Sequence, residues 1–283
     1  MADDGQGARR SGDVGEDRRP ADGTARVDTT VAHNARVWNH WIGGGDAYEV
    51  DRRVGDRIAG MFPLIREIAR ADRRFLRRAV THLARERGAR QFLDLGTGLP
   101  TGDNTHEIAQ RIAPDARVVY VDNDPVVLAH ARTLLTGAPE GATAYLEADV
   151  RDPAAILERA AGTLDLGRPV AVMMLGILNF VPDGGAARDI VRRIMAELPP
   201  GSHLVLTHPT HDSALGGEGQ IPAMRFWNEN ATPPITARTG EEIAAFFTGL
   251  DLLEPGLVSC SRWRAEDGGA TVVPQYGAVA VKP

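Results

Sequence analysis

Cysteine, lysine and long hydrophobic runs are nearly absent from this chain of 283 residues. The single cysteine, Cys260, excludes a disulfide within the chain and a zinc site built from several cysteines. The longest apolar run, Val170–Leu178, is much shorter than the ~20 residues of a membrane-spanning helix. The N-terminus also has no apolar signal-peptide core. These absences predict a cytoplasmic protein without a membrane partner.

Positive charge is carried almost entirely by arginine, since Lys282 is the only lysine, and the net charge is −6. This negative balance argues against broad nucleic-acid binding. A local arginine cluster between Arg66 and Arg78 is typical of the solvated face of a long helix. Apolar residues make up 43% of the chain and charged residues 25%, as in ordinary globular proteins. No pattern in the sequence indicates an oligomeric state.

The composition divides the chain into three regions. Residues 1–30 are rich in Gly, Asp and Arg with hardly an apolar residue, and we expect them to form a flexible tail. Residues 31–89 carry apolar side chains at helical spacing and are expected to form a helical cap or lid. Residues 90–283 alternate short apolar strands with helices, which predicts an α/β domain with a parallel sheet.

Two helices are expected within the cap. The first carries Trp38 and Trp41 and ends at the run of three glycines that follows them. The second has Pro63 near its first position and runs to about Arg87, where Gly88 ends it.

Five short apolar segments are expected to be strands, because helical patterns separate them. A capping box at Asn104 and Glu107 marks the start of one intervening helix, and an aspartate followed by proline at Asp124 and Asp152 marks two more. The expected strands are Gln91–Leu95, Arg117–Asp122, Thr143–Glu147, Val170–Leu175 and Ser202–Thr207.

The C-terminal part departs from this alternation. The stretch Pro209–Pro234 is longer than an ordinary connection and is expected to be a functional loop or a subdomain insert. Thr239 and Glu242 form another capping box. The segments Asp251–Val258 and Tyr276–Val281 are strand-like with no helical pattern between them, which predicts a terminal β-hairpin.

Acidic and glycine-rich segments stand at the ends of three successive strands. Asp94–Gly98 (DLGTG) follows the first strand, where a nucleotide-type ligand meets a doubly wound sheet. Asp122 ends the second strand, where a carboxylate can accept from both ribose hydroxyls. Asp149 follows the third strand and either contacts an adenine amino group or caps the next helix, although Asp152 suits the capping role better.

Taken together, these motifs resemble those of the class I S-adenosylmethionine-dependent methyltransferases, in the segments Asp94–Gly98, Val121–Asp122 and Ala148–Val150 and in the closing hairpin. More narrowly, the chain resembles an actinobacterial family that was once a domain of unknown function and is now called S-adenosyl methyltransferase. This resemblance runs from about Val31 to the C-terminus. Its segments are Asn39–Gly44 (NHWIGG), Gly96–Thr101 (GTGLPT), Asn104–Glu107 (NTHE) and Glu254–Val258 (EPGLV).

The resemblance implies an enzyme that transfers a methyl group from S-adenosylmethionine (SAM) to a small-molecule acceptor. It implies a Rossmann-like α/β fold with a seven-stranded, mostly parallel sheet whose last strand is antiparallel, covered by an N-terminal helical cap. The expected cofactor-binding residues are Asp94, Gly96, Thr97, Gly98, Asp122, Asn123, Asp149, Val150 and Leu175. The expected substrate or lid residues are Trp41, Gly44, Tyr48 and Asn179.

Two positions depart from the patterns of these families. Pro100 stands where many methyltransferases have a third glycine, which stiffens the loop near the methionine part of the cofactor. Gly45 stands where the narrower family often has a basic residue, so a side chain that contacts an anion is missing there.

Methyl transfer needs positioning more than proton removal, so a catalytic base is optional. His208, which follows the fifth strand, is the first candidate because neutral imidazole accepts a proton near pH 7. Alternatively, it is a hydrogen-bonded residue that ends a strand. His208, His211 and Asp212 form too small a cluster to predict a metal site, so no metal is expected.

Two other functions remain open at this point. A protein that binds SAM as a signal without transferring its methyl group would carry the same cofactor motifs. An NAD(P)-dependent oxidoreductase is disfavoured by Asp149 and because Thr101 stands where the third glycine of a dinucleotide fingerprint belongs.

Overall fold

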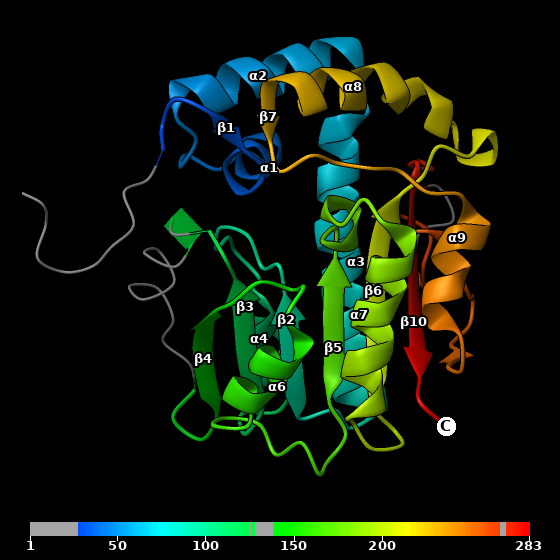
Figure 1. Cartoon of the computed structure of the whole chain (residues 1–283). Coiled ribbons are helices and arrows are strands. Elements are labelled where there is room, and N and C mark those ends of the chain that lie inside the picture. Colours follow the sequence, from blue (N-terminus) through cyan, green and yellow to red (C-terminus); the bar gives the residue numbers. More distant parts are fainter. Residues whose placement is uncertain (1–27, 125, 128–137, 267–269) are drawn as a thin grey trace, which may run out of the picture.

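The computed structural model describes residues 28–124, 126–127, 138–266 and 270–283. A sheet of eight strands forms the centre of this described part. Its strands are β2 (Gln91–Leu95), β3 (Arg117–Asp122), β4 (Ala142–Glu147), β5 (Ala171–Leu175), β6 (His203–Pro209), β8 (Asp251–Leu252), β9 (Val258–Ser259) and β10 (Gln275–Val281). Seven of them follow the spatial order β4-β3-β2-β5-β6-β10-β8, and β9 pairs with β10 (Figure 1).

The strand directions confirm the predicted Rossmann-like sheet. The neighbours from β4 to β6 pair in parallel, whereas β10 is antiparallel to both β6 and β8. The long pairing of β10 with β6 runs from Gln275 opposite Pro209 to Val281 opposite His203. All five strands expected from the alternating pattern are present within two residues of their predicted ends. The two-residue β9 is an addition to the expected seven.

The C-terminal hairpin is present with an interrupted first arm. The segment Asp251–Val258 was expected to be one strand, and that detail is wrong. A turn in which the Gly256 N–H donates to the Leu253 carbonyl separates β8 from β9. Pro255 has no backbone N–H for a ladder, and Gly256 takes a left-handed φ of 80°, so strand pairing stops here.

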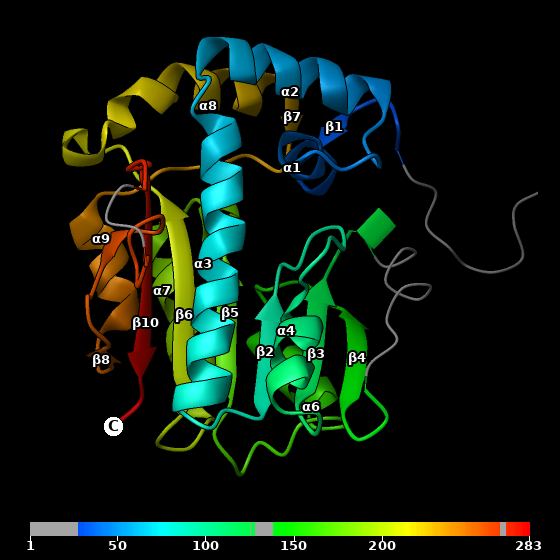
Figure 2. The ribbon, with the colours of Figure 1, turned by 180° about the vertical axis from the view of Figure 1, so that it is seen from behind.

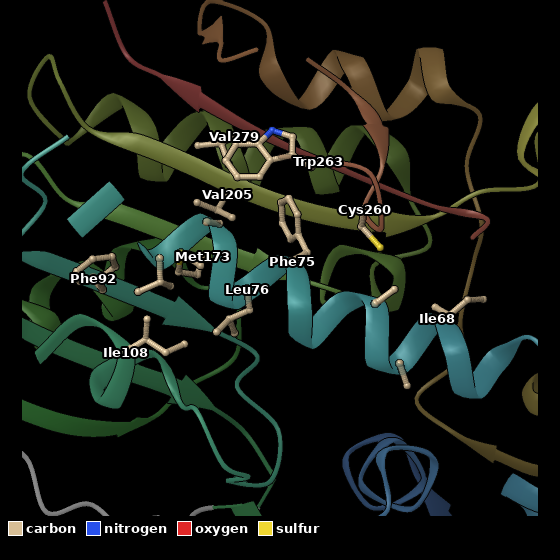
Figure 3. Packing of buried hydrophobic residues seen from close by; sticks show 14 of the residues in the cluster. Ile68, Phe75, Leu76, Phe92, Ile108, Met173, Val205, Cys260, Trp263 and Val279 are labelled. Atoms are coloured by element: carbon tan, nitrogen blue, oxygen red, sulfur yellow. The ribbon is translucent and has the colours of Figure 1, made fainter. Parts of the chain in front are cut away.

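Helices cover both faces of the sheet. On one face α3 and α4 pack against Phe92, Met173 and Val205, and Figure 3 shows Phe75 and Leu76 of α3 pointing into this core (Figures 2 and 3). The other face packs against α6, α7 and the segment that follows α9. The helices are α3 (Ile65–Glu86), α4 (Thr105–Ile112), α6 (Pro153–Ala160), α7 (Gly184–Ala196) and α9 (Gly240–Ala244).

Local sequence signals set several helix ends as predicted. Asn104 and Thr239 cap α4 and α9 in capping boxes, and the Asp152 carboxylate accepts from the Ala155 N–H at the start of α6. Because Asp152 caps this helix, Asp149 is not its cap. The helix predicted to start at Asp124–Pro125 lies largely outside the described residues, as do residues 1–27 of the predicted tail.

A group of elements far apart in sequence lies above the carboxyl ends of the parallel strands (Figures 1 and 2). The helix α2 packs against both α1 and α8, and the two-residue strands β1 and β7 pair in parallel. α1 ends at Gly43, whose φ of 94° suits a glycine stop. These elements are β1 (Ala32–His33), α1 (Asn34–Ile42), α2 (Glu49–Met61), α8 (Ile221–Asn230) and β7 (Ala231–Thr232).

The long stretch Pro209–Pro234 therefore contains a helix that joins the N-terminal helices. Helix α3 begins beside these elements and continues down one face of the sheet, so it belongs to both layers (Figure 2). The predicted division at residues 89 and 90 remains a prediction. No helix in the described part of the chain is long and apolar enough to cross a membrane.

Candidate cofactor and acceptor site

A cavity of about 410 Å³ lies between the carboxyl ends of the parallel strands and the helices above them. Its wall includes the ends of β2, β3 and β5 and side chains from α1, α3 and α8. Ligands of open α/β sheets bind at this edge, and a cavity of this size suits a small molecule.

The glycine-rich loop after β2 forms part of the cavity wall. Gly96 and Gly98 both take left-handed conformations, with φ of 73° and 63°. A Cβ at Gly96 would lie 2.5 Å from the Ile177 side chain, so no larger residue fits without movement. The hydroxyl of Thr97 bonds that of Tyr145. The loop therefore presents backbone rather than bulky side chains to the cavity.

Two carboxylates stand beside this loop, the buried Asp94 and the half-buried Asp122. Asp94 accepts a 2.6 Å hydrogen bond from the Thr105 hydroxyl, and burial raises its pKa to about 6. Asp122 accepts from the Gly98 N–H and from the Asp124 N–H, both at 2.9 Å, and burial raises its pKa as well. Because a carboxylate has about four acceptor positions, each side chain keeps sites for further donors.

The remaining predicted cofactor residues also line the cavity, namely Asn123, Asp149, Val150 and Leu175. Asp149 differs from Asp94 and Asp122 because its side chain is 42% exposed and pairs with Arg151 at 3.1 Å. It also accepts the Arg151 N–H at 2.8 Å. Its carboxylate is thus more solvated than that of Asp94 or Asp122.

Asn179 brings an unsatisfied polar atom to the cavity. Its side chain is 2% exposed, and its Oδ1 is buried without a hydrogen-bond partner in the described residues. The backbone carbonyl of Asn179 accepts from the Thr236 N–H at 2.9 Å, which fixes the segment. A buried acceptor without a donor is unfavourable by about 1–3 kcal/mol, so this atom fits a ligand that donates to it.

The predicted lid residues separate into two groups. Trp41 lines the cavity next to Trp38, with ring centroids 6.0 Å apart in an edge-on arrangement, and its Nε1–H donates to the Gly55 carbonyl at 3.0 Å. Gly44 and Tyr48 are not among the lining residues. A Cβ at Gly44 would collide with the Asn39 amide, and Tyr48 is 40% exposed. Gly44 and Tyr48 therefore lie outside the cavity, and their surroundings favour a structural role.

The prediction that His208 is the catalytic base is wrong, because its side chain does not reach the cavity. Its side chain is fully buried and does not line the cavity. Nδ1 donates to the Pro209 carbonyl at 2.8 Å, and Nε2 accepts from Arg238 at 2.6 Å. Burial lowers the pKa of His208 to about 3. The alternative interpretation, a hydrogen-bonded residue near the end of a strand, describes this environment.

Several polar residues that line the cavity were not predicted from the sequence. Asp72 and Arg73 come from α3, Gln220 precedes α8 and Gln275 begins β10. Asp72 carried a recognisable signal, because it interrupts an apolar stripe at helical spacing. Gln220 and Gln275 carried no such signal, because each stands at the end of a segment that is distant in sequence from Asp72 and Arg73. In the described part of the chain, no group of three His, Cys, Asp or Glu side chains is placed to hold a metal ion.

The residues at the strand ends fit SAM as a cofactor. Carboxylates with free acceptor positions suit its hydroxyl and amino donors, and left-handed glycines let the backbone approach it closely. Together, the Rossmann-like sheet and this site define a SAM-dependent methyltransferase. The chain belongs to the S-adenosyl methyltransferase family, which it matches over residues 20–283.

Two crystal structures of actinobacterial proteins are similar over most of the chain. A DUF574 family protein from Streptomyces avermitilis is 45% identical with a TM-score of 0.86, and the match covers 91% of this chain and all of that protein. A candidate methyltransferase from Thermobifida fusca is 37% identical with a TM-score of 0.82, over 90% of this chain and 96% of that one. A comparison with curated proteins found no significant match.

Proposed function

We propose that this methyltransferase acts on a small, largely apolar acceptor. The acceptor occupies the helical half of the cavity, which is the part formed by the lining residues of α1, α3 and α8. The cofactor then occupies the strand-end half, formed by the lining residues in the last two positions of β2, β3 and β5 and in the segments that follow β2, β3, β4 and β5. The observation that carries this proposal is one continuous cavity with these two differently lined ends.

The strand-end half is suited to hold the cofactor through acceptor groups. In this proposal Asp122, at the end of β3, accepts from the ribose hydroxyls, and Asp94, near the end of β2, accepts from the amino group of the methionine part. Asp149 and Val150 follow β4, where the adenine is expected. When bound, SAM supplies an electrophilic methyl group on a sulfonium, and S-adenosylhomocysteine (SAH) is the product that remains.

The helical half is suited to orient an apolar acceptor and to exclude water. Trp41 on α1, Ile68 on α3 and Trp227 on α8 line it, and all three side chains are at least nine-tenths buried. A displacement at a methyl carbon requires the attacking atom to be in line with the leaving sulfur at near-attack distance. Rigid aromatic and aliphatic walls serve that purpose, and they leave little room for a polymer backbone.

Methylation assays with SAM test the proposal. SAH release is measured with a panel of aromatic and alicyclic small molecules, and in parallel with bulk tRNA and with a peptide library. We expect turnover with small molecules and none with the polymers. Turnover confined to tRNA or peptides would contradict the proposal. Calorimetry with SAH and NADH checks the cofactor half, where only SAH is expected to bind.

A further inference from the structure

Asp72 is a buried carboxylate in the middle of the helical half. It lies on α3, lines the cavity and is 5% exposed. Ile68 and Leu76, one turn before and one turn after it, also line the cavity. Of the lining residues that α1, α3 and α8 contribute, only Asp72 and Arg73 are charged. A carboxylate in an apolar stripe is unfavourable unless it has hydrogen-bonding partners.

One oxygen of Asp72 is fully engaged by the sheet. The Thr207 hydroxyl donates to Oδ1 at 2.6 Å, and the Gln275 side-chain amide donates to the same atom. These donors come from the adjacent antiparallel strands β6 and β10. No hydrogen bond from the described residues reaches Oδ2. The carboxylate is therefore oriented by two donors while its second oxygen remains available.

The neighbouring cation does not occupy that oxygen. The Arg73 guanidinium donates to the carbonyls of Gly102 and Asp103, at 3.2 and 2.9 Å, and so ties α3 to the loop before α4. Asp94, another acidic side chain that lines the cavity, repels rather than binds Asp72. The open oxygen of Asp72 thus lacks a donor among the described residues, in a cavity whose size suits a small molecule.

We propose that Oδ2 of Asp72 binds the acceptor and that the acceptor is a hydrophobic molecule whose reacting atom is a hydroxyl oxygen or an amine nitrogen carrying a hydrogen. This inference rests on the function proposed above. The donor on the acceptor satisfies the open oxygen, and the apolar walls bind the rest of the molecule. A reacting carbon atom offers no such donor itself.

The chemical step follows from this contact. The acceptor's oxygen or nitrogen forms a bond to the methyl carbon while the carbon–sulfur bond breaks. The electron pair of the broken bond stays on sulfur. The acceptor's proton passes to Oδ2 of Asp72. Burial raises the pKa of Asp72 to about 6, which makes its carboxylate a better proton acceptor than a solvated one while leaving it mostly ionised above pH 7.

A purely structural role for Asp72 would need only the contacts of Oδ1. The substitution Asp72→Asn separates the two roles because the amide oxygen of asparagine can still accept from Thr207 and Gln275. Its amide nitrogen then replaces Oδ2 and donates into the cavity instead of accepting. The variant therefore inverts the hydrogen-bond polarity at one position and changes the volume little.

The test uses two probes that differ in one methyl group, 2-naphthol and 2-methoxynaphthalene. Their affinities for the full chain saturated with SAH are measured by NMR titration at pH 7.5. We expect 2-naphthol to bind at least about tenfold more tightly, because a hydrogen bond to a buried charge is lost with the ether. Asp72→Asn should abolish or reverse this preference. Glu67→Gln, on the exposed side of the same helix, should preserve it.

Three results would overturn the inference: equal affinities for the two probes, an unchanged preference in Asp72→Asn, or no binding of 2-naphthol up to its solubility limit. Each of these results counts only for a variant that binds SAH, which calorimetry must first establish. A chain that does not bind SAH at all would instead contradict the proposed cofactor half. The two failures are thus distinguishable.

Discussion

The two halves of the cavity are built in different ways. The strand-end half consists of short segments at the ends of adjacent parallel strands, such as the glycine loop after β2 and Asp122 at the end of β3. The helical half is assembled from α1 and α3 of the N-terminal part and from α8, which is distant from them in sequence but lines the same cavity. The first half is polar and backbone-lined, whereas the second is mainly apolar with a single open carboxylate.

This difference indicates a division of labour between a cofactor end defined by local motifs and an acceptor end defined by packing. Substitutions in one half should therefore leave ligand binding in the other half nearly unchanged. Ligand binding measured separately with SAH and with 2-naphthol tests this independence directly, since SAM-dependent turnover alone would mix both effects.

The largest effect is expected from Asp122→Ala, which should weaken SAH binding by about 100-fold or more. The carboxylate is half-buried and oriented by two backbone N–H groups, and its loss removes two charge-assisted hydrogen bonds to the ribose. Calorimetry with SAH measures the change. Asp149→Ala is the matched comparison, and we expect a loss of about tenfold or less because that carboxylate is solvated and paired with Arg151. Equal losses would contradict the assignment of the two carboxylates.

The next effect should appear in the other half alone. Ala223 on α8 is buried and lines the cavity, so Ala223→Phe fills space in the helical half. We expect 2-naphthol binding to fall at least about tenfold by steric exclusion, while SAH affinity changes by less than about threefold. Ile221→Phe, at an exposed position on the same helix, is the control. A parallel loss of SAH binding in Ala223→Phe would show that the halves are not independent.

The sequence predicted the strand-end half well because its signals are local. A glycine loop after a strand, and carboxylates at the ends of the next two strands, share one edge of a parallel sheet whatever the rest of the chain does. The helical half depends on the contact of α8 with α2 and on the pairing of β1 with β7. No local pattern in Pro209–Pro234 specified those partners.

The wrong prediction for His208 on β6, and the failure to predict Asp72 as a site residue, have a related cause. Both faces of this strand are buried, so the sequence pattern does not distinguish which of two neighbouring side chains points to the cavity side. Thr207 faces Asp72 and α3, and His208 therefore faces Arg238 on the opposite side. Asp72 was recognisable only as a carboxylate at helical spacing between Ile68 and Leu76.

The two buried titratable side chains on opposite sides of β6, His208 of the strand and Asp72 of α3, should also couple stability to pH in opposite directions. The pKa of His208 is lowered to about 3 by burial, so as the pH falls below 6.5 the unfolded chain takes up a proton that the folded chain does not. His208 thus reduces stability with falling pH. Asp72, whose pKa is raised to about 6, contributes stability below pH 4 that is lost as the pH rises towards 6.

Urea unfolding at pH 5, 6 and 7 measures both contributions. His208→Gln should lessen the loss of stability between pH 7 and pH 5 by about 1–2 kcal/mol, and Asp72→Asn should change the same slope in the opposite direction. SAH affinity at pH 7 should change by less than about threefold in His208→Gln, because its side chain is outside the cavity. A change of the slope in the same direction in both variants would contradict the burial of the two side chains.

The smallest effect is expected on the outer side of the helices above the sheet. Tyr48 is 40% exposed, and its main side-chain contact is the Arg36 guanidinium, 5.2 Å from the ring centroid. Tyr48→Ala should therefore lower the free energy of unfolding by about 0.5–1 kcal/mol and leave the affinities for SAH and 2-naphthol within about twofold. Trp41→Ala, at a buried position that lines the cavity, should lower the same free energy by about 3–5 kcal/mol. If Tyr48→Ala instead weakened SAH binding as strongly as Asp122→Ala, the outer surface would have to reach the cofactor, and the separation into a strand-end half and a helical half would not hold.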